Sequence, residues 1–271
     1  MKQLVSSVFL LIATLAHAQA ADPPVSYVIA GDAFQPPSTK DQAAILAALC
    51  DGTVEKNTCN TCPQSSVAET GFTLRRVISG HFLGSQSTDA FVTIFGCEEM
   101  HASIGWGFLV TKRADTWEPA AEVLGLELDH CHRMAFRSGR EFLVCEDYRM
   151  ESFQLMHSVY AVIAKEKKIT FRNLLTAADT TRECDEQPRV QKAQIDKIDF
   201  GNQISLTASI GTMPDSPRRR KQCQDIEDNI SKAPRPTPTA MKTYRIDYQF
   251  DGRQFKLTQE SEPAAKLFHW E

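Results

Sequence analysis

Cysteine and histidine are the residues of this chain whose types and spacing could do chemistry. Cys59 and Cys62 form a Cys-x-x-Cys pair, the spacing of thiol–disulfide exchange sites, in which a helix N-terminus lowers the pKa of the first thiol. Polar residues precede this pair and poor helix formers follow it, so the sequence favours two structural disulfides over redox chemistry. A haem attachment needs a histidine where Pro63 stands, and structural zinc needs a second ligand pair.

His130 and His132 form the second candidate site. Alternate residues of a strand share a face, so the two imidazoles point the same way and could bind one metal ion, with His101 as a third ligand. The alternative is a pair of exposed histidines on a polar strand face. The sequence contains no G-x-S-x-G, H-E-x-x-H, P-loop or dinucleotide-binding motif, so we predict no catalytic residue and no cofactor.

The N-terminal segment predicts export. A short charged start, an apolar run over residues 4–15 and a small-x-small cleavage site at residues 16–18 or 18–20 are typical of a signal peptide over residues 1–20. We therefore expect a secreted or periplasmic protein. In an oxidising compartment an even number of cysteines predicts four disulfides. The eight are Cys50, Cys59, Cys62, Cys97, Cys131, Cys145, Cys184 and Cys223.

The spacing of the cysteines predicts part of their pairing. Cys131 and Cys145 flank the turn at residues 138–139 nearly symmetrically, as a disulfide between neighbouring strands would. Eight cysteines allow 105 pairings, so the others rest on weaker grounds. The remaining expected pairs are Cys184 with Cys223, Cys50 with either Cys59 or Cys62, and Cys97 with whichever of those two is left.

Composition limits the classes of partner. The chain has 30 Lys and Arg against 34 Asp and Glu, a net charge of −4, which gives no reason to expect a nucleic-acid partner. No second apolar run approaches the roughly 18–20 residues of a membrane helix, so we predict no membrane span. The hydrophobic fraction of 42% is typical of a globular protein.

One helix is predicted near residues 40–50. Thr39 and Gln42 have the spacing of a capping box, and the residues that follow are mostly strong helix formers. We place this helix in an N-terminal region, residues 21–71, that begins with a proline-rich arm and ends with a cysteine-rich loop.

After residue 71 the pattern changes to that of β-strands. Turn residues and alternating apolar residues predict three similar units of four antiparallel strands each. Four strands in about 50 residues are typical of propeller blades, although three blades cannot close a ring, and a simple meander is the alternative. The predicted divisions are a β domain over 72–260, its units at 72–123, 126–175 and 193–259, a proline-rich insertion at 211–240, and a C-terminal tail at 261–271.

Residues 79–97 carry a family resemblance. Ser79-Gly80-His81-Phe82-Leu83-Gly84, followed by Thr88-Asp89-Ala90-Phe91-Val92, resembles a degenerate FG-GAP/VCBS-type propeller repeat. The resemblance implies a β architecture that presents loops to ligands or partners. The calcium loop of that family alternates acidic residues, whereas Asp89 is the one charged residue of 84–89, so calcium binding is not carried over.

These observations predict a mainly β, exported and disulfide-stabilised protein. We expect it to be non-enzymatic and to bind an unknown protein or small ligand through loops of the β scaffold. Two alternatives stay open. One is a secreted or periplasmic hydrolase whose site is not visible in the sequence, and the other is a thiol-redox or metal protein that uses Cys59 and Cys62, or His130 and His132.

Overall fold

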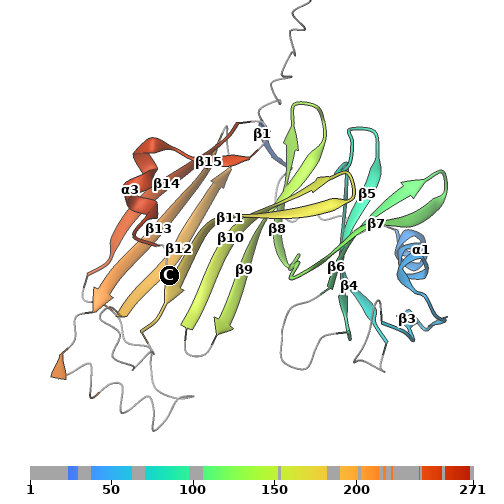
Figure 1. The fold of residues 1–271 in the computed structure, drawn as a ribbon, viewed down its shortest axis with the longest axis horizontal. Helices are drawn as coiled ribbons and strands as arrows, with labels where there is room; N and C mark the ends of the chain where they lie inside the picture. The colour runs from blue at the N-terminus through green and yellow to red at the C-terminus, as the bar shows by residue number, and fades with distance from the viewer. Residues whose placement is uncertain are drawn as a thin grey trace, which may run out of the picture.

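The structure is a computed structural model, and it is mainly β with every strand pair antiparallel (Figure 1). Its strands form a nine-stranded sheet, a four-stranded sheet and a two-stranded hairpin. None of the described helices is long and apolar enough to cross a membrane. The described residues are 24–29, 38–62, 71–97, 106–151, 154–181, 190–200, 203–213, 240–251 and 254–268, together with positions 216, 217, 221 and 238.

The first predicted unit forms a sheet of its own. Its strands lie side by side in chain order. They are β4 (Thr73–Gly80), β5 (Thr88–Phe95), β6 (Trp106–Arg113) and β7 (Thr116–Leu124).

The second and third predicted units join into one nine-stranded sheet. Their strands also follow one another in chain order, and β11 pairs with β12 at Asp179 and Lys192, so the two units form a meander and not separate blades. The strands are β8 (His130–Phe136), β9 (Glu141–Glu151), β10 (Gln154–Lys165), β11 (Lys168–Asp179), β12 (Val190–Phe200), β13 (Ile204–Met213), β14 (Lys242–Phe250) and β15 (Phe255–Leu257).

The proline-rich arm contributes a strand that the sequence pattern does not predict. β1 (Pro24–Ile29) pairs antiparallel with β8 and becomes one edge of the nine-stranded sheet. At the other end of the chain, η1 (Gln259–Ser261) and α3 (Glu262–Ala265) follow β15. Phe268, in the predicted C-terminal tail, is buried, and its ring lies 6.2 Å from that of Tyr244.

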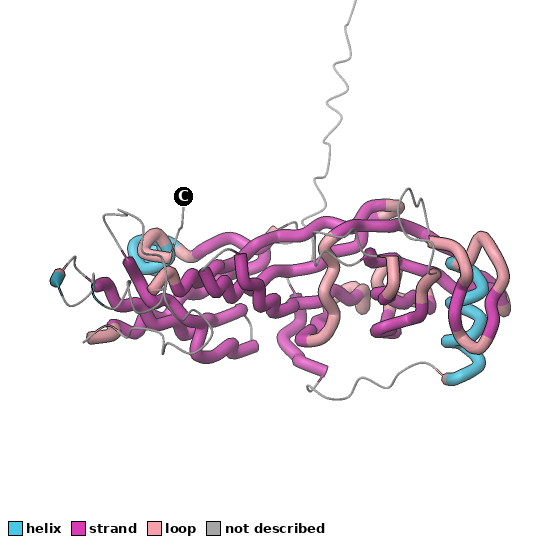
Figure 2. Tube along the Cα trace, turned by 90° about the horizontal axis from the view of Figure 1, so that it is seen from below, coloured by secondary structure: helices cyan, strands magenta, loops and turns pink. Residues whose placement is uncertain are grey.

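The predicted helix is α1 (Thr39–Leu49), but its cap is Ser38 and not Thr39. The Ser38 side chain accepts a hydrogen bond from the amide of Asp41 at 3.1 Å, which satisfies one of the free amides of the first turn. The helix buries Ile45 and Leu49 against the four-stranded sheet. Figure 2 shows α1 and α3 toward opposite ends of an elongated molecule.

Three disulfides lie within the described residues. Cys50 bonds Cys59 and Cys62 bonds Cys97, so that the hairpin of β2 (Val54–Glu55) and β3 (Thr58–Cys59) is joined both to the end of α1 and to the end of β5. The third disulfide joins Cys131 to Cys145, which pair directly across β8 and β9. Cys184, Cys223 and most of the predicted insertion lie outside the described residues.

Candidate functional site

The Cys-x-x-Cys pair is divided between two disulfides. Cys59 is fully buried and bonded to Cys50, while Cys62 is bonded to Cys97. Neither sulfur is bonded to the other, and neither is a thiol. The pair therefore connects three segments of the N-terminal region and gives no reactive dithiol in this state.

Alternation along β8 and β9 divides their side chains between two environments. Cys131 and Cys145 lie in the core between the two sheets, together with Leu143. His130 and His132 point to the opposite face of β8, and Glu146 pairs directly with His130 across β9. We call these two faces the inter-sheet face and the cleft face.

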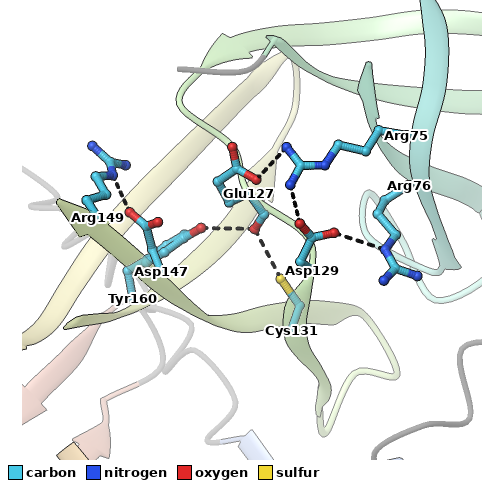
Figure 3. A network of polar contacts seen from close by, with 8 residues as sticks. All are labelled: Arg75, Arg76, Glu127, Asp129, Cys131, Asp147, Arg149 and Tyr160. Atoms are coloured by element: carbon cyan, nitrogen blue, oxygen red, sulfur yellow. Dashed lines mark hydrogen bonds and ion pairs between the residues drawn. The ribbon is translucent and has the colours of Figure 1, made fainter. Parts of the chain in front are cut away.

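On the inter-sheet face, a network of charges holds the start of β8 to the four-stranded sheet (Figure 3). Arg75 of β4 forms ion pairs with Asp129 and with Glu127, the latter at 3.2 Å. Arg76 reaches Asp129 with its Nε at 3.0 Å from the carboxylate. We call these four residues the arginine–carboxylate network.

Burial and charge act in opposite directions on the two acids of this network. Burial would raise the pKa of Asp129, but hydrogen bonds from Arg76 and the charge of Arg75 outweigh it, so this pKa is lowered. For Glu127 burial is the larger effect, and its pKa is raised despite the charge of Arg75. Asp129 is therefore the acid that remains charged most firmly and orders both arginines.

The backbone between the two acids is fixed as well. The hydroxyl of Tyr160 donates to the carbonyl oxygen of Glu127 at 3.0 Å, and Cys131 Sγ lies 3.4 Å from the same oxygen. Arg149 forms an ion pair with Asp147 nearby on β9 (Figure 3). These contacts hold the start of β8 in place, and His130 and His132 project from that segment on the cleft face.

The cleft face contains a cleft of about 370 Å³ between β8 and β9 on one side and β12 on the other. Its volume lies within the range of small-molecule sites. Charged, aromatic and aliphatic side chains meet in it. The lining residues are His132, Glu146, Tyr148, Ile195, Asp196, Lys197, Ile198 and Phe200.

Glu146 is the central polar group of the cleft. Its Oε2 lies 2.9 Å from Nε2 of His157 and accepts a hydrogen bond from the Tyr148 hydroxyl at 3.3 Å. The hydrogen bond with His157 is the largest effect on the carboxyl, and together with the Tyr148 hydroxyl it lowers the pKa of Glu146 against the effect of burial. Burial, and then the charge of Glu146, raises the pKa of Tyr148. The carboxylate is therefore charged at neutral pH, and the phenol is a donor.

Aromatic rings surround this carboxylate. The ring of His157 stacks on that of Tyr148 with centroids 4.0 Å apart, and the ring of His130 meets Tyr148 edge-on at 6.0 Å. His132 packs against Phe200 with centroids 4.7 Å apart. Its Nδ1 is buried and has no hydrogen-bond partner among the described residues. A buried nitrogen without a partner is costly to keep.

The predicted metal site is only partly within the described residues. The structure places His130 and His132 on one face as expected, but His101 lies outside the described residues. Within the described part of the chain, no group of three or more His, Cys, Asp or Glu side chains is arranged to hold a metal ion. Metal binding by the two histidines stays a prediction.

The structure adds site residues that the motif search did not find. Glu146 belongs to a pair of neighbouring acids that has no motif, and Tyr148, His157 and Phe200 have none either. One signal could have found Glu146. If Cys131 faces Cys145 in an antiparallel pair, the preceding residue of β8 faces the following residue of β9, which puts His130 opposite Glu146.

Asp89, the acid of the predicted FG-GAP/VCBS-type loop, has a structural role here. It is fully buried, and its Oδ2 accepts hydrogen bonds from the amide of Leu83 at 2.7 Å and from the hydroxyl of Ser87 at 2.5 Å. These hydrogen bonds to the carboxylate stabilise the loop between β4 and β5.

Comparison with known proteins adds no assignment: no family model, no curated protein and no solved structure matches this chain.

Proposed function

We propose that this chain is an exported, disulfide-stabilised binding protein that takes a small ligand into the cleft between β9 and β12. The observation that carries the proposal is the combination found there. A charged carboxylate and the imidazole of His132 line a cavity of about 370 Å³ with aromatic and aliphatic walls. Polar groups that fix orientation, set among apolar walls that supply affinity, are typical of ligand sites.

The rigidity of the surroundings supports binding. Two features on the inter-sheet face stabilise β8 and β9. They are the disulfide between Cys131 and Cys145 and the arginine–carboxylate network. A site that is already ordered loses less entropy when its ligand binds. The ligand would contact strands here, and not the loops that the sequence pattern suggested.

The choice of side chains favours binding over catalysis. The lining offers a carboxylate for charge and aromatic and aliphatic side chains for apolar contact, which are the groups that hold a small ligand. The resemblance of residues 79–97 to FG-GAP/VCBS-type repeats, whose loops bind ligands or partners, supports a binding role in the same way. The three disulfides support export, which N-terminal sequencing of the mature protein tests directly.

A cleft-filling variant tests the binding proposal. Phenethylammonium, phenylacetate and benzyl alcohol are added in turn to ¹⁵N-labelled protein, and the shifted amide signals are assigned. We expect at least one compound to shift the signals of Glu146, Tyr148 and Phe200, and to be recovered unchanged. Ile198→Trp should abolish these shifts by filling the cleft, whereas Val54→Trp, at an exposed position of β2, should leave them. Shifts that persist in Ile198→Trp, or no shift with any compound, would refute the proposal.

A further inference from the structure

Three apolar side chains are exposed beside the cleft, near the end of the β9–β10 hairpin. Tyr148, Met150 and Leu155 expose 54%, 71% and 38% of their surface. Met150 pairs directly with Leu155, and Tyr148 stands two residues before Met150, so all three share the face that carries Glu146. We call them the hairpin stripe. Single exposed apolar residues are common on protein surfaces, but a row that continues a polar cleft is typical of a binding surface.

The inner end of this surface is negative. Oε2 of Glu146 accepts from His157 and Tyr148, but Oε1 has no hydrogen-bond partner within the described part of the chain. Glu146 lines the cleft, so a donor in the cleft can reach this oxygen. An ammonium group carries three donors, so it can donate to Oε1 of Glu146 and keep two donors for water or another acceptor.

The other charges in the cleft also favour a cation. Lys197 is the one lysine or arginine that lines it, and its Nζ lies 2.5 Å from a carboxylate oxygen of Asp199, so this positive charge is paired with a negative one. Asp196 receives hydrogen bonds from two uncharged donors, the amide of Gln194 and the hydroxyl of Ser209. Neither donor is charged, so no cation among the described residues is paired with this carboxylate.

The distance between the two ends sets the length of the ligand. Glu146 and Met150 are four positions apart along β9, so their backbones lie about 13 Å apart at the rise of a strand. A compound that reaches both ends therefore needs a cationic head and an extended apolar tail.

We propose that the cleft binds an amphiphilic amine, with its ammonium group at Glu146 and its apolar tail along the hairpin stripe. This inference rests on the proposed function and names the ligand class of the same cleft.

A series of alkylammonium ions tests both ends of this site. Butyl-, hexyl- and octylammonium are titrated calorimetrically below the concentrations at which they aggregate. We expect the affinity to rise about twofold to fourfold with each methylene, up to the ~0.8 kcal/mol of a fully buried CH₂. Glu146→Gln should weaken all three compounds by about tenfold or more, since it removes a charged hydrogen bond. Glu55→Gln, an exposed acid on β2, should change nothing.

Met150→Ser tests the tail. We expect it to flatten the dependence on chain length while butylammonium binds as before, and Leu124→Ser, at an exposed apolar position of β7, should leave the dependence intact.

The wild-type protein alone can overturn the inference, so the result does not depend on the folding of a variant. If octanoate binds as tightly as octylammonium, the inference that the ligand is a cation is wrong. If the affinities do not change with chain length, the inference that the hairpin stripe binds the tail is wrong. In either case binding that Ile198→Trp abolishes would leave the proposed function standing. If none of the alkyl compounds binds but an aromatic compound does, the ligand class is wrong and the binding role is not.

Discussion

Asp41→Asn removes a charge that connects α1 to the four-stranded sheet. Asp41 stands in the first turn of α1, where its Oδ2 accepts from the hydroxyl of Ser38 at 2.8 Å. Its Oδ1 accepts from Nζ of Lys112 at 2.9 Å and from the indole nitrogen of Trp117 at 3.0 Å. Asparagine keeps the shape of the side chain and loses its charge, so the variant isolates the electrostatic part of these contacts.

The pKa of Asp41 gives the magnitude. The hydrogen bond from Lys112 is the largest cause, followed by those from Trp117 and Ser38, and together they lower this pKa from 3.8 to about 2. At about 1.36 kcal/mol per pKa unit the shift corresponds to at most about 2 kcal/mol. The side chain is 28% exposed, so solvent screens part of this, and we expect a loss of about 1 kcal/mol.

The pH dependence of the loss identifies its cause. A pKa that is lowered in the folded state stabilises the protein fully above the unfolded value of 3.8, and this stabilisation disappears as the pH falls from there through about 2. Urea unfolding of wild type and Asp41→Asn, followed by tryptophan fluorescence between pH 7 and 2.5, should show a gap that is largest at neutral pH and shrinks in acid. Asp115→Asn, in the exposed turn between β6 and β7, should show no such gap. A gap that stays constant or widens toward low pH would refute the reasoning.

Three further variants test the contacts around the inter-sheet face. Asp129→Asn should lower the free energy of unfolding by about 1–2 kcal/mol in urea titrations, because one carboxylate orders two arginines; an unchanged midpoint would mean that the network is screened. Replacing both Cys131 and Cys145 by serine should cost about 3 kcal/mol by the same assay, the loop-closure value for their separation of 14 residues, and equal stability with and without reductant would contradict it. Glu141→Gln should cost about 1 kcal/mol by thermal and urea unfolding, because it removes the charge that lies 3.6 Å from Nε of Arg133, and a neutral effect would show that the pair contributes nothing.

The strands and turns that depend on residues close together in the sequence were predictable. The four antiparallel strands expected in the first unit are found as β4 to β7, and the turn expected at residues 138–139 is found with Gly139 at a φ of +79°. Turn residues and alternation act within a few positions of each other. The pairing of β11 with β12, and of β1 with β8, joins segments that share no local signal, so the sequence could not show that two units form one sheet.

The candidate site was only partly predictable for the same reason. His130 and His132 could be placed on one face because they lie in one strand. The wall formed by β12 depends on an irregularity in its pairing between Ile195 and Lys197, which leaves Asp196 with no register partner on β13. This bulge shifts the alternation, so Ile195 and Ile198 both line the cleft although they are three positions apart.

The disulfide across β8 and β9 also guards against a particular error of assembly. If β8 slid by a single position along β9, His130 and His132 would turn to the inter-sheet face. The sulfur of Cys131 would turn to the cleft face. Once the covalent bond has formed, that slipped arrangement is forbidden. Material produced without oxidation lacks this safeguard, and it can have normal strand content while presenting an inverted recognition surface.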